Sequence, residues 1–246
     1  MFSYKDYCDI VKIVKESGRN ATFHDARELD AFVIMRHDVE FSVDRAYQLA
    51  QLEKSLDFTS TYFFQWTNNS YNILSKKNTD MIRTMHEEGH TIGLHFAVNG
   101  LENLEEIKAK ISLEVDVLSR MLGFEIDTFS VHRPSKEILK ANIKMDGIIN
   151  AYEDHFFTYM DSVDENSQLQ VKYISDAQHR WNYGIPDRET ILYNQKVQIL
   201  THPYSWTKEG YDNLNNFKTL IKERHEELIQ TINGECKHFS SILDQL

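Results

Sequence analysis

The chain of 246 residues contains only two cysteines, three prolines and nine glycines. Cys8 and Cys236 lie near opposite ends and form no Cys-x-x-Cys pair, which argues against a thiolate zinc site and against a disulfide framework. Few glycines and prolines, together with no low-complexity stretch, give no sign of a linker between domains. We therefore expect a single compact domain over residues 1–246.

Positive charge is also scarce, because 27 Lys and Arg stand against 38 Asp and Glu, for a formal net charge of −11. This balance disfavours nucleic acid as a partner, since phosphate binding needs clustered Lys and Arg. No apolar run approaches the roughly eighteen residues of a membrane span. The first residues also lack the basic and then apolar pattern of a signal peptide. We expect a cytoplasmic protein without a membrane span.

Strand-like and helix-like segments alternate along most of the chain. The expected strands are about seven and cover residues 32–38, 58–64, 91–96, 126–132, 147–152, 171–176 and 197–202. The expected helices cover residues 4–16, 42–56, 79–88, 104–122, 136–143 and 209–232, with another after Pro186. This alternation predicts an α/β fold with parallel strands, either an irregular (β/α) barrel or an open doubly wound sheet. Both architectures place an active site at the carboxyl ends of the strands.

Titratable side chains collect at those strand ends. Asp38 and Glu40 stand two residues apart at the end of the first strand, so both face one side. Two carboxylates in one place repel unless a cation or a proton separates them. Other strand ends carry His95, His132 with Arg133, Asp176 and His202. Each residue alone could be a buried histidine or a capping turn, but together they favour a metal-assisted active site.

Five segments resemble the motifs of the polysaccharide deacetylase family, the NodB-homology domain of carbohydrate esterase family 4. They are Arg36-His-Asp-Val-Glu40, Gly89-His-Thr-Ile-Gly-Leu-His95, Phe129-Ser-Val-His-Arg-Pro-Ser135, Tyr173-Ile-Ser-Asp-Ala-Gln-His-Arg-Trp181 and Ile199-Leu-Thr-His-Pro203. They cover about residues 30–206, ahead of the expected C-terminal helix 209–232. The match resembles a divergent branch associated with surface-polysaccharide biosynthesis. The resemblance implies an irregular (β/α) barrel of about seven strands, in agreement with the independent strand count.

The resemblance also implies roles for the matching residues. Asp38 corresponds to the catalytic base, and Glu40 to a metal-binding carboxylate where the family usually has Asp. His95 corresponds to the first metal histidine, and His202 to the general acid. Arg133 resembles the arginine that orients the base.

The fourth motif and the residues after His202 supply candidates for the pocket wall. Asp176 and Trp181 resemble the part of the family motif that tunes the catalytic histidine and lines the pocket. Trp181, Tyr204 and Trp206 are aromatic side chains near the site that could stack on a sugar ring, or could equally pack within loops.

One position departs from the family pattern. The family's second metal histidine lies four residues after the first, where this chain has Asn99. Asparagine is a neutral oxygen donor, whereas zinc prefers imidazole, thiolate or carboxylate ligands. Asn99 or His132, or another group, then completes the metal shell; the alternatives are weaker binding or no metal.

These observations predict a metal-dependent hydrolase, with zinc as the expected divalent ion. It would remove an N-acetyl or other acyl group from an amino sugar, which could be a small molecule or a lipid-linked or nucleotide-linked intermediate of surface-polysaccharide biosynthesis. Two alternatives stay open. One is a catalytically silent protein that binds carbohydrate or acts as a scaffold, and the other is a different metal-dependent amidohydrolase on the same barrel.

Overall fold

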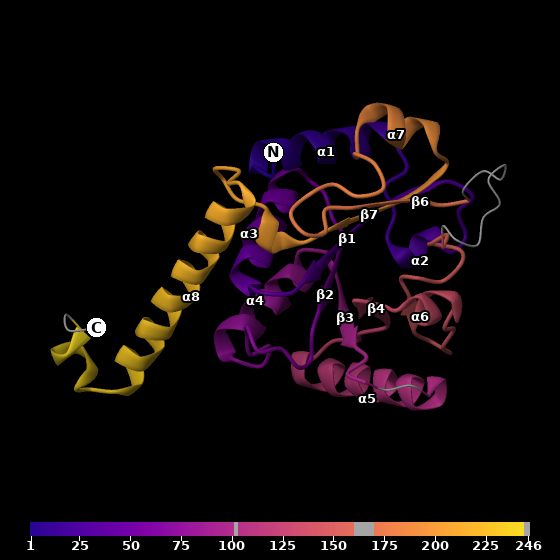
Figure 1. The fold of residues 1–246 in the computed structure, drawn as a ribbon. Coiled ribbons are helices and arrows are strands. Elements are labelled where there is room, and N and C mark those ends of the chain that lie inside the picture. Colours follow the sequence, from indigo (N-terminus) through magenta and orange to yellow (C-terminus); the bar gives the residue numbers. More distant parts are fainter. Residues whose placement is uncertain (101–102, 160–169, 244–246) are drawn as a thin grey trace.

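The computed structural model describes residues 1–100, 103–159 and 170–243. Within these residues, seven parallel strands form one sheet in the order β5-β4-β3-β2-β1-β7-β6 (Figure 1). The strands are β1 (Phe32–Val39), β2 (Thr61–Phe64), β3 (Thr91–Ala97), β4 (Thr128–His132), β5 (Ile149–Asn150), β6 (Lys172–Ser175) and β7 (Lys196–Thr201). This is the cyclic order of a barrel with one break, between β5 and β6. The sheet is therefore a curled half-barrel, and the predicted seven-stranded α/β fold is confirmed.

Both faces of β1 are buried along its whole length. Phe32 and Ile34 face the inside of the half-barrel and pack in one hydrophobic cluster with Phe63. Val33 and Met35 face the opposite side and pack in a second cluster beneath the helices. A strand that is covered on both faces needs a continuous apolar run, which explains the sequence at this point. The alternation also sends Arg36 and Asp38 to the inner face and His37 to the outer face.

Helices cover the outer face of the sheet (Figure 1). The helices of the described residues are α1 (Tyr4–Ser17), α2 (Phe23–Ala26), α3 (Val43–Ser55), α4 (Lys76–Glu87), α5 (Leu104–Leu122), α6 (Lys136–Lys140), α7 (Arg188–Tyr193) and α8 (Asn213–Glu235), with short 3-10 turns at η2 (Pro203–Ser205) and η3 (Phe239–Ser241). Helix α2 is an exception, because its Phe23 and Ala26 pack in the inner cluster with Phe32. The side chain of Ser3 caps α1 by accepting a hydrogen bond from the backbone N–H of Asp6. Gly123 ends α5 in a left-handed conformation that costs glycine nothing.

Several helices differ from their predicted bounds: the helix expected over residues 209–232 starts at Asn213, and the helix expected over residues 136–143 ends at Lys140. The helix predicted to start at Thr79 starts at Lys76, because Ser75 is the residue whose side chain accepts a hydrogen bond from the backbone N–H of Asn78. Thr79 lies in the first turn, where its hydroxyl donates to the carbonyl of Ser75. Helix α2 was not predicted, since its four residues are too short to show a helical period.

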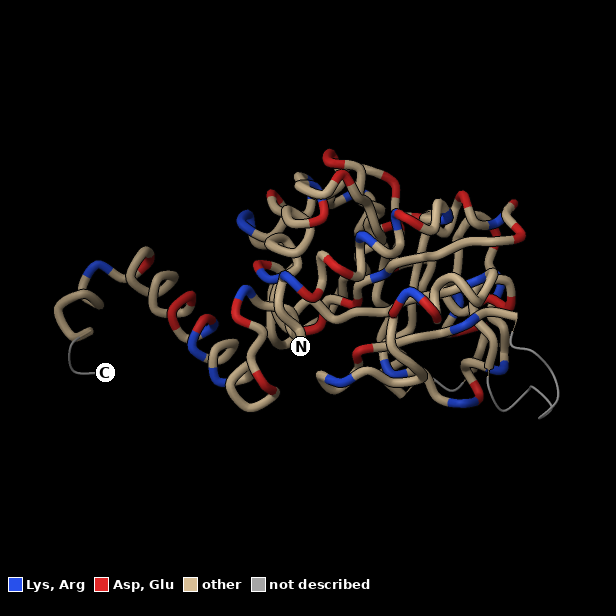
Figure 2. Tube along the Cα trace, turned by 90° about the horizontal axis from the view of Figure 1, so that it is seen from above, with Lys and Arg blue, Asp and Glu red and all other residues tan. Residues whose placement is uncertain are grey.

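Helix α8 extends away from the body of the molecule (Figure 1). Its first half is attached through the buried Arg45 of α3, which donates to Glu223 and to Asn216. No helix of the described residues is long and apolar enough to cross a membrane. Acidic and basic residues are interspersed along the chain (Figure 2).

Candidate metal centre and active site

A cleft of about 820 Å³ lies at the carboxyl ends of the strands. Asp38 at the end of β1, His95 of β3 and His202 after β7 all line it, together with Glu40. His132, the last residue of β4, lies at the side of this cleft in a smaller pocket that Glu40 and Asn99 also line. The predicted convergence of strand ends is therefore present in the structure.

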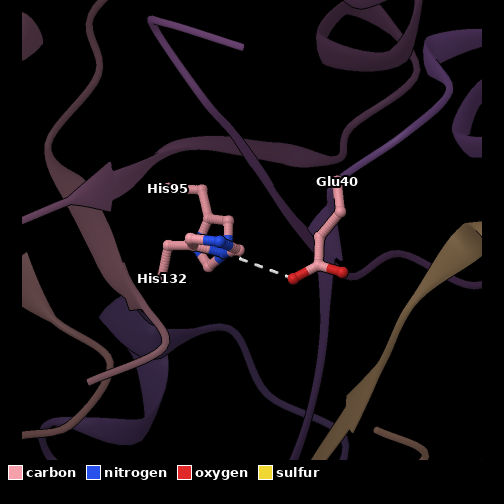
Figure 3. A group of neighbouring side chains, drawn as sticks. All are labelled: Glu40, His95 and His132. Carbon is pink, nitrogen blue, oxygen red and sulfur yellow. Dashed lines mark hydrogen bonds and ion pairs between the residues drawn. The ribbon is translucent and has the colours of Figure 1, made fainter. Parts of the chain in front are cut away.

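Glu40, His95 and His132 place three ligand atoms within 4.8 Å of one another. Nδ1 of His132 lies 3.2 Å from Oε1 of Glu40 and 3.1 Å from Nε2 of His95 (Figure 3). Four ligands at zinc's usual bond lengths stand about 3.4 Å apart at the corners of a tetrahedron. Two imidazoles and one carboxylate with these separations fit zinc, so these three residues would hold the ion.

His95 is oriented by a chain of hydrogen bonds on its far side. The hydroxyl of Ser130 donates to Oδ1 of Asp38 at 3.3 Å, so its oxygen accepts from Nδ1 of His95 at 2.7 Å. This assignment puts the ring proton on Nδ1 and leaves the lone pair of Nε2 facing Glu40 and His132. Burial lowers the pKa of His95 to about 4, so the ring is neutral and able to bind a metal.

Glu40 is the charged member of this group. Burial works against its ionisation, but the hydrogen bond with His132 and the nearby His202 and His95 outweigh burial and hold its pKa below the ordinary value. The side chain is therefore a carboxylate at neutral pH, as a metal ligand must be.

Asp38 lies against a fully buried arginine on its own strand. Arg36 donates to Oδ2 of Asp38 at 3.2 Å and to the hydroxyl of Tyr152 at 2.7 Å. Burial opposes ionisation of Asp38, but Arg36, followed by His95 and His202, outweighs it and holds the pKa of Asp38 below its ordinary value. Asp38 is thus an ionised carboxylate at the edge of the metal group.

His202 is held from behind by Asp176. Nδ1 of His202 lies 2.6 Å from Oδ1 of Asp176, and the backbone N–H of His202 donates to both carboxylate oxygens. Burial alone would lower the pKa of His202, but the Asp176 carboxylate raises it to about 9. The imidazolium is therefore the main form at neutral pH, and its second N–H, on Nε2, is available to the cleft.

The fold resembles those of solved structures, although the sequence is far from them. No family model matches the chain, and no curated protein matches it. Among solved structures, a CE4 esterase from Streptococcus mutans superposes with a TM-score of 0.50 at 15% identity, over 87% of this chain and 91% of that chain. The fold is that of the family 4 carbohydrate esterases.

Two further solved structures are similar at lower scores. The chitin deacetylase from the fungal pathogen Colletotrichum lindemuthianum is 17% identical over 78% of this chain and 81% of its own, with a TM-score of 0.46. A CE4 family pseudoenzyme from Bacillus anthracis is 12% identical with a TM-score of 0.46, and the match covers 79% of this chain but only 60% of the pseudoenzyme.

On this esterase fold, the arginine beside Asp38 differs from the one that the motif resemblance implied. Arg36 makes the contact with Asp38, whereas Arg133 is exposed at the cleft. Arg133 adopts a left-handed backbone conformation, with φ at 47°, directly after β4. The signal for Arg36 was available in the sequence, since side chains two apart on a strand share a face.

The three aromatic candidates for the pocket wall lie in different places. Tyr204 lines the cleft and packs edge-on against Phe41. Trp206 is only 1% exposed and donates its indole N–H to Asp176 at 2.8 Å. Trp181 packs beside Trp206, with ring centroids 6.0 Å apart. The structure thus places both tryptophans in the packing behind Asp176, and Tyr204 on the cleft.

Asn99 follows β3 in a left-handed conformation, with φ at 49°, and lines the smaller pocket with His132. Gln65 and His132 are also neighbours there, with Nε2 of Gln65 3.3 Å from Nδ1 of His132. The third candidate metal ligand, beside Glu40 and His95, is therefore a nitrogen of His132 at the end of β4.

Proposed function

We propose that this protein is a metal-dependent hydrolase that removes an N-acetyl group from an amino sugar. The observation that carries the proposal is the group of three candidate metal ligands, Glu40, His95 and His132. Beside it lie a deprotonated carboxylate, Asp38, and a protonated imidazole, His202. The fold, shared with a CE4 esterase, supports a carbohydrate as the substrate. The cleft volume of about 820 Å³ is sufficient for a sugar with substituents.

A divalent ion bound at the three ligands, with zinc as the best fit, would acidify a water molecule and polarise the acyl oxygen. Asp38, which Arg36 keeps ionised, accepts the proton of the attacking water. His202, which Asp176 keeps protonated, donates a proton to the leaving amine. A base held deprotonated and an acid held protonated in one cleft are the pair that amide hydrolysis requires.

Our proposal for the substrate is an amino-sugar intermediate of surface-polysaccharide biosynthesis, handled in the cytoplasm. The motif resemblance to the divergent deacetylase branch supports this pathway. Tyr204 on the cleft wall supports a bound sugar, because an aromatic ring can stack on the apolar face of a pyranose.

A carbohydrate-binding protein without catalytic activity is the second candidate. It is favoured by one observation, the presence of Asn99 at the position of the family's second metal histidine. The two candidates differ in metal binding, since a silent protein has no requirement for zinc at Glu40, His95 and His132.

The test is acetate release from a panel of N-acetylated amino sugars, free and linked, after loading the purified protein with one equivalent of Zn²⁺. We expect release by the wild type, and none by Asp38→Asn with the same zinc content. Absence of acetate across the panel, from protein that binds zinc at the site, would exclude the deacetylase, and absence of zinc binding would favour the silent binder.

A further inference from the structure

Apart from Asp38 and Glu40, the charged side chains that line the cleft are all positive among the described residues. The acidic lining residues are Asp38 and Glu40, which contact Arg36 and His132 at the deep end. The remaining charged lining residues are Arg133, Lys136 and Lys172. This is the reverse of the whole chain, in which acidic residues outnumber basic ones by 38 to 27. A cleft of one sign attracts ligands of the opposite sign.

Arg133 and Lys172 lie at the cleft and have no counter-charge among residues 1–100, 103–159 and 170–243. Neither makes an ion pair with a residue that the structure describes, although 38 acidic residues are present in the chain. Lys172 is half-buried, and a Cβ built on Gly184 would lie 3.4 Å from its Nζ, so the ammonium group packs close over that glycine. A half-buried ammonium that has no carboxylate partner in the described part of the chain is suited to an anionic ligand.

The same cleft has a wall of aromatic rings that runs from the catalytic groups to solvent. Tyr152, which accepts a hydrogen bond from Arg36, packs against Phe157 with ring centroids 5.1 Å apart. Phe157 packs against Tyr173 at 5.1 Å, across the opening between β5 and β6, and Tyr173 against Tyr183 at 5.7 Å. Tyr183, the outermost ring, is 59% exposed.

We propose that the cleft binds an amino sugar linked to a nucleoside diphosphate. This inference rests on the proposed function for the position of the acetamido group, at the metal end beside Asp38. The diphosphate then lies against Arg133 and Lys172, where each cation forms charge-assisted hydrogen bonds with phosphate oxygens. The base stacks on the exposed ring of Tyr183, since aromatic rings bind bases through their π-faces.

The inference can be tested by calorimetric titration, which reads binding without turnover. The probes are uridine diphosphate N-acetylglucosamine, uridine diphosphate and free N-acetylglucosamine. One series uses zinc-loaded protein, and a second uses protein kept in EDTA, so that affinity of diphosphate for zinc does not enter. We expect both nucleotides to bind in both series and the free sugar to bind at least about tenfold more weakly.

Matched variants assign the binding to the proposed residues. Arg133→Ala and Lys172→Ala should each weaken nucleotide binding about tenfold, and Lys54→Ala, an exposed lysine of α3 outside the cleft, should not change it. Tyr183→Ala should weaken binding of the nucleotide but not of N-acetylglucosamine 1-phosphate. Tyr193→Ala, which removes a 77% exposed ring outside the cleft, is the control for that change.

The outcomes separate this inference from the proposed function. Acetate release by a protein that binds no uridine diphosphate, or whose binding is the same in the Lys172 and Arg133 variants, overturns the inference alone. Equal affinity for N-acetylglucosamine 1-phosphate and the nucleotide sugar overturns recognition of the base. Nucleotide binding that responds to these variants, without acetate release from any substrate, supports the inference and contradicts the proposed hydrolase.

Discussion

Strand β1 carries a buried charged cluster on each of its two faces. On the inner face, Arg36 and Asp38 lie beside His95 and the cleft. On the outer face, His37 lies 3.2 Å from Glu53 of α3, and both side chains are fully buried. Consecutive residues of one strand thus build two polar groups that are separated by the sheet.

The outer cluster, defined here as Glu53 with its contacts, is closed. Tyr7 donates to Oε1 of Glu53 at 2.5 Å, and Ser60 and Tyr62 donate to Oε2 at 2.7 Å each. Four groups, counting His37, therefore satisfy the carboxylate from α1, β1 and the region of β2, and Nδ1 of His90 lies 3.6 Å from Oε2. A buried charge with all its partners supplied by the protein joins helices to the sheet and has nothing left for a ligand.

The inner cluster is open. Nε2 of His95, Nδ1 of His132 and Oε1 of Glu40 converge on one point, and the second N–H of His202 is available to the same cleft. Burial of charge therefore does not by itself indicate a functional site. What marks the inner cluster is that its unused donors and acceptors point to a shared cavity.

The largest effect should come from Asp38→Asn. This change removes the proposed base from the inner cluster while keeping an oxygen that accepts a hydrogen bond from Arg36. We expect acetate release to fall by about 100- to 10,000-fold, which is the range that a general base contributes to the rate. Zinc content, measured on the same preparation, should stay at one per chain, and a protein that lost its zinc would make Asp38 a ligand instead.

The change Glu53→Ala should have the largest effect on folding. It leaves His37, Tyr7 and Tyr62 buried without their shared acceptor, so we expect a loss of about 3–5 kcal/mol in the free energy of unfolding, measured in urea. Glu106→Ala, an exposed glutamate of α5, is the matched control and should change stability by less than about 0.5 kcal/mol. Similar losses in the two variants would show that the outer cluster is not a structural centre.

The pair His132→Ala and Asn99→Ala decides which residue completes the metal shell. Because His132 lies 3.1–3.2 Å from the other two ligand atoms, we expect its loss to weaken zinc binding by about 100-fold or more. Asn99→Ala should leave the affinity nearly unchanged. The reverse order, read by zinc titration with a competing chelator, would assign the site to the family's usual position.

The smallest effect should be a shift of the pH profile in Asp176→Asn. His202 acts in its protonated form, so activity of the wild type should fall as the pH rises through about 9. Without the Asp176 carboxylate the pKa of His202 falls, and the alkaline limb of the profile should move down by at least about one unit, or about 1.4 kcal/mol. Asp187→Asn, which changes the exposed cap of α7, should leave the limb in place.

The sequence predicts the strands of this fold better than its short helices. Apolar runs that end on charge identify the buried parallel strands, as at residues 32–38. The start of α4 is set by Ser75 and not by Thr79, because the Ser75 hydroxyl is the one that accepts a hydrogen bond from a free backbone N–H of the first turn. The pattern of hydrophobic residues does not show which hydroxyl makes this bond. For the site, the sequence predicts correctly that Asp38, Glu40, His95 and His202 lie together at one edge of the sheet.

The positions of Arg36 and Trp206 in the site depend on where each side chain points. Arg36 occupies the place beside Asp38 because it shares the inner face of β1, whereas Arg133 follows β4 with a left-handed backbone. Trp206 follows the 3-10 turn η2, and its ring is buried beneath Asp176. Motif order alone does not distinguish a ring that faces the cleft from one that packs behind it.

The central claim is that Glu40, His95 and His132 form a metal centre. It is tested most directly by anomalous diffraction at the zinc absorption edge from crystals grown with Zn²⁺. The account predicts one anomalous peak at about 2.0–2.2 Å from one oxygen of Glu40 and one nitrogen each of His95 and His132. A map without a peak at these residues, while zinc is present in the crystal and the side chains keep their positions, would contradict it.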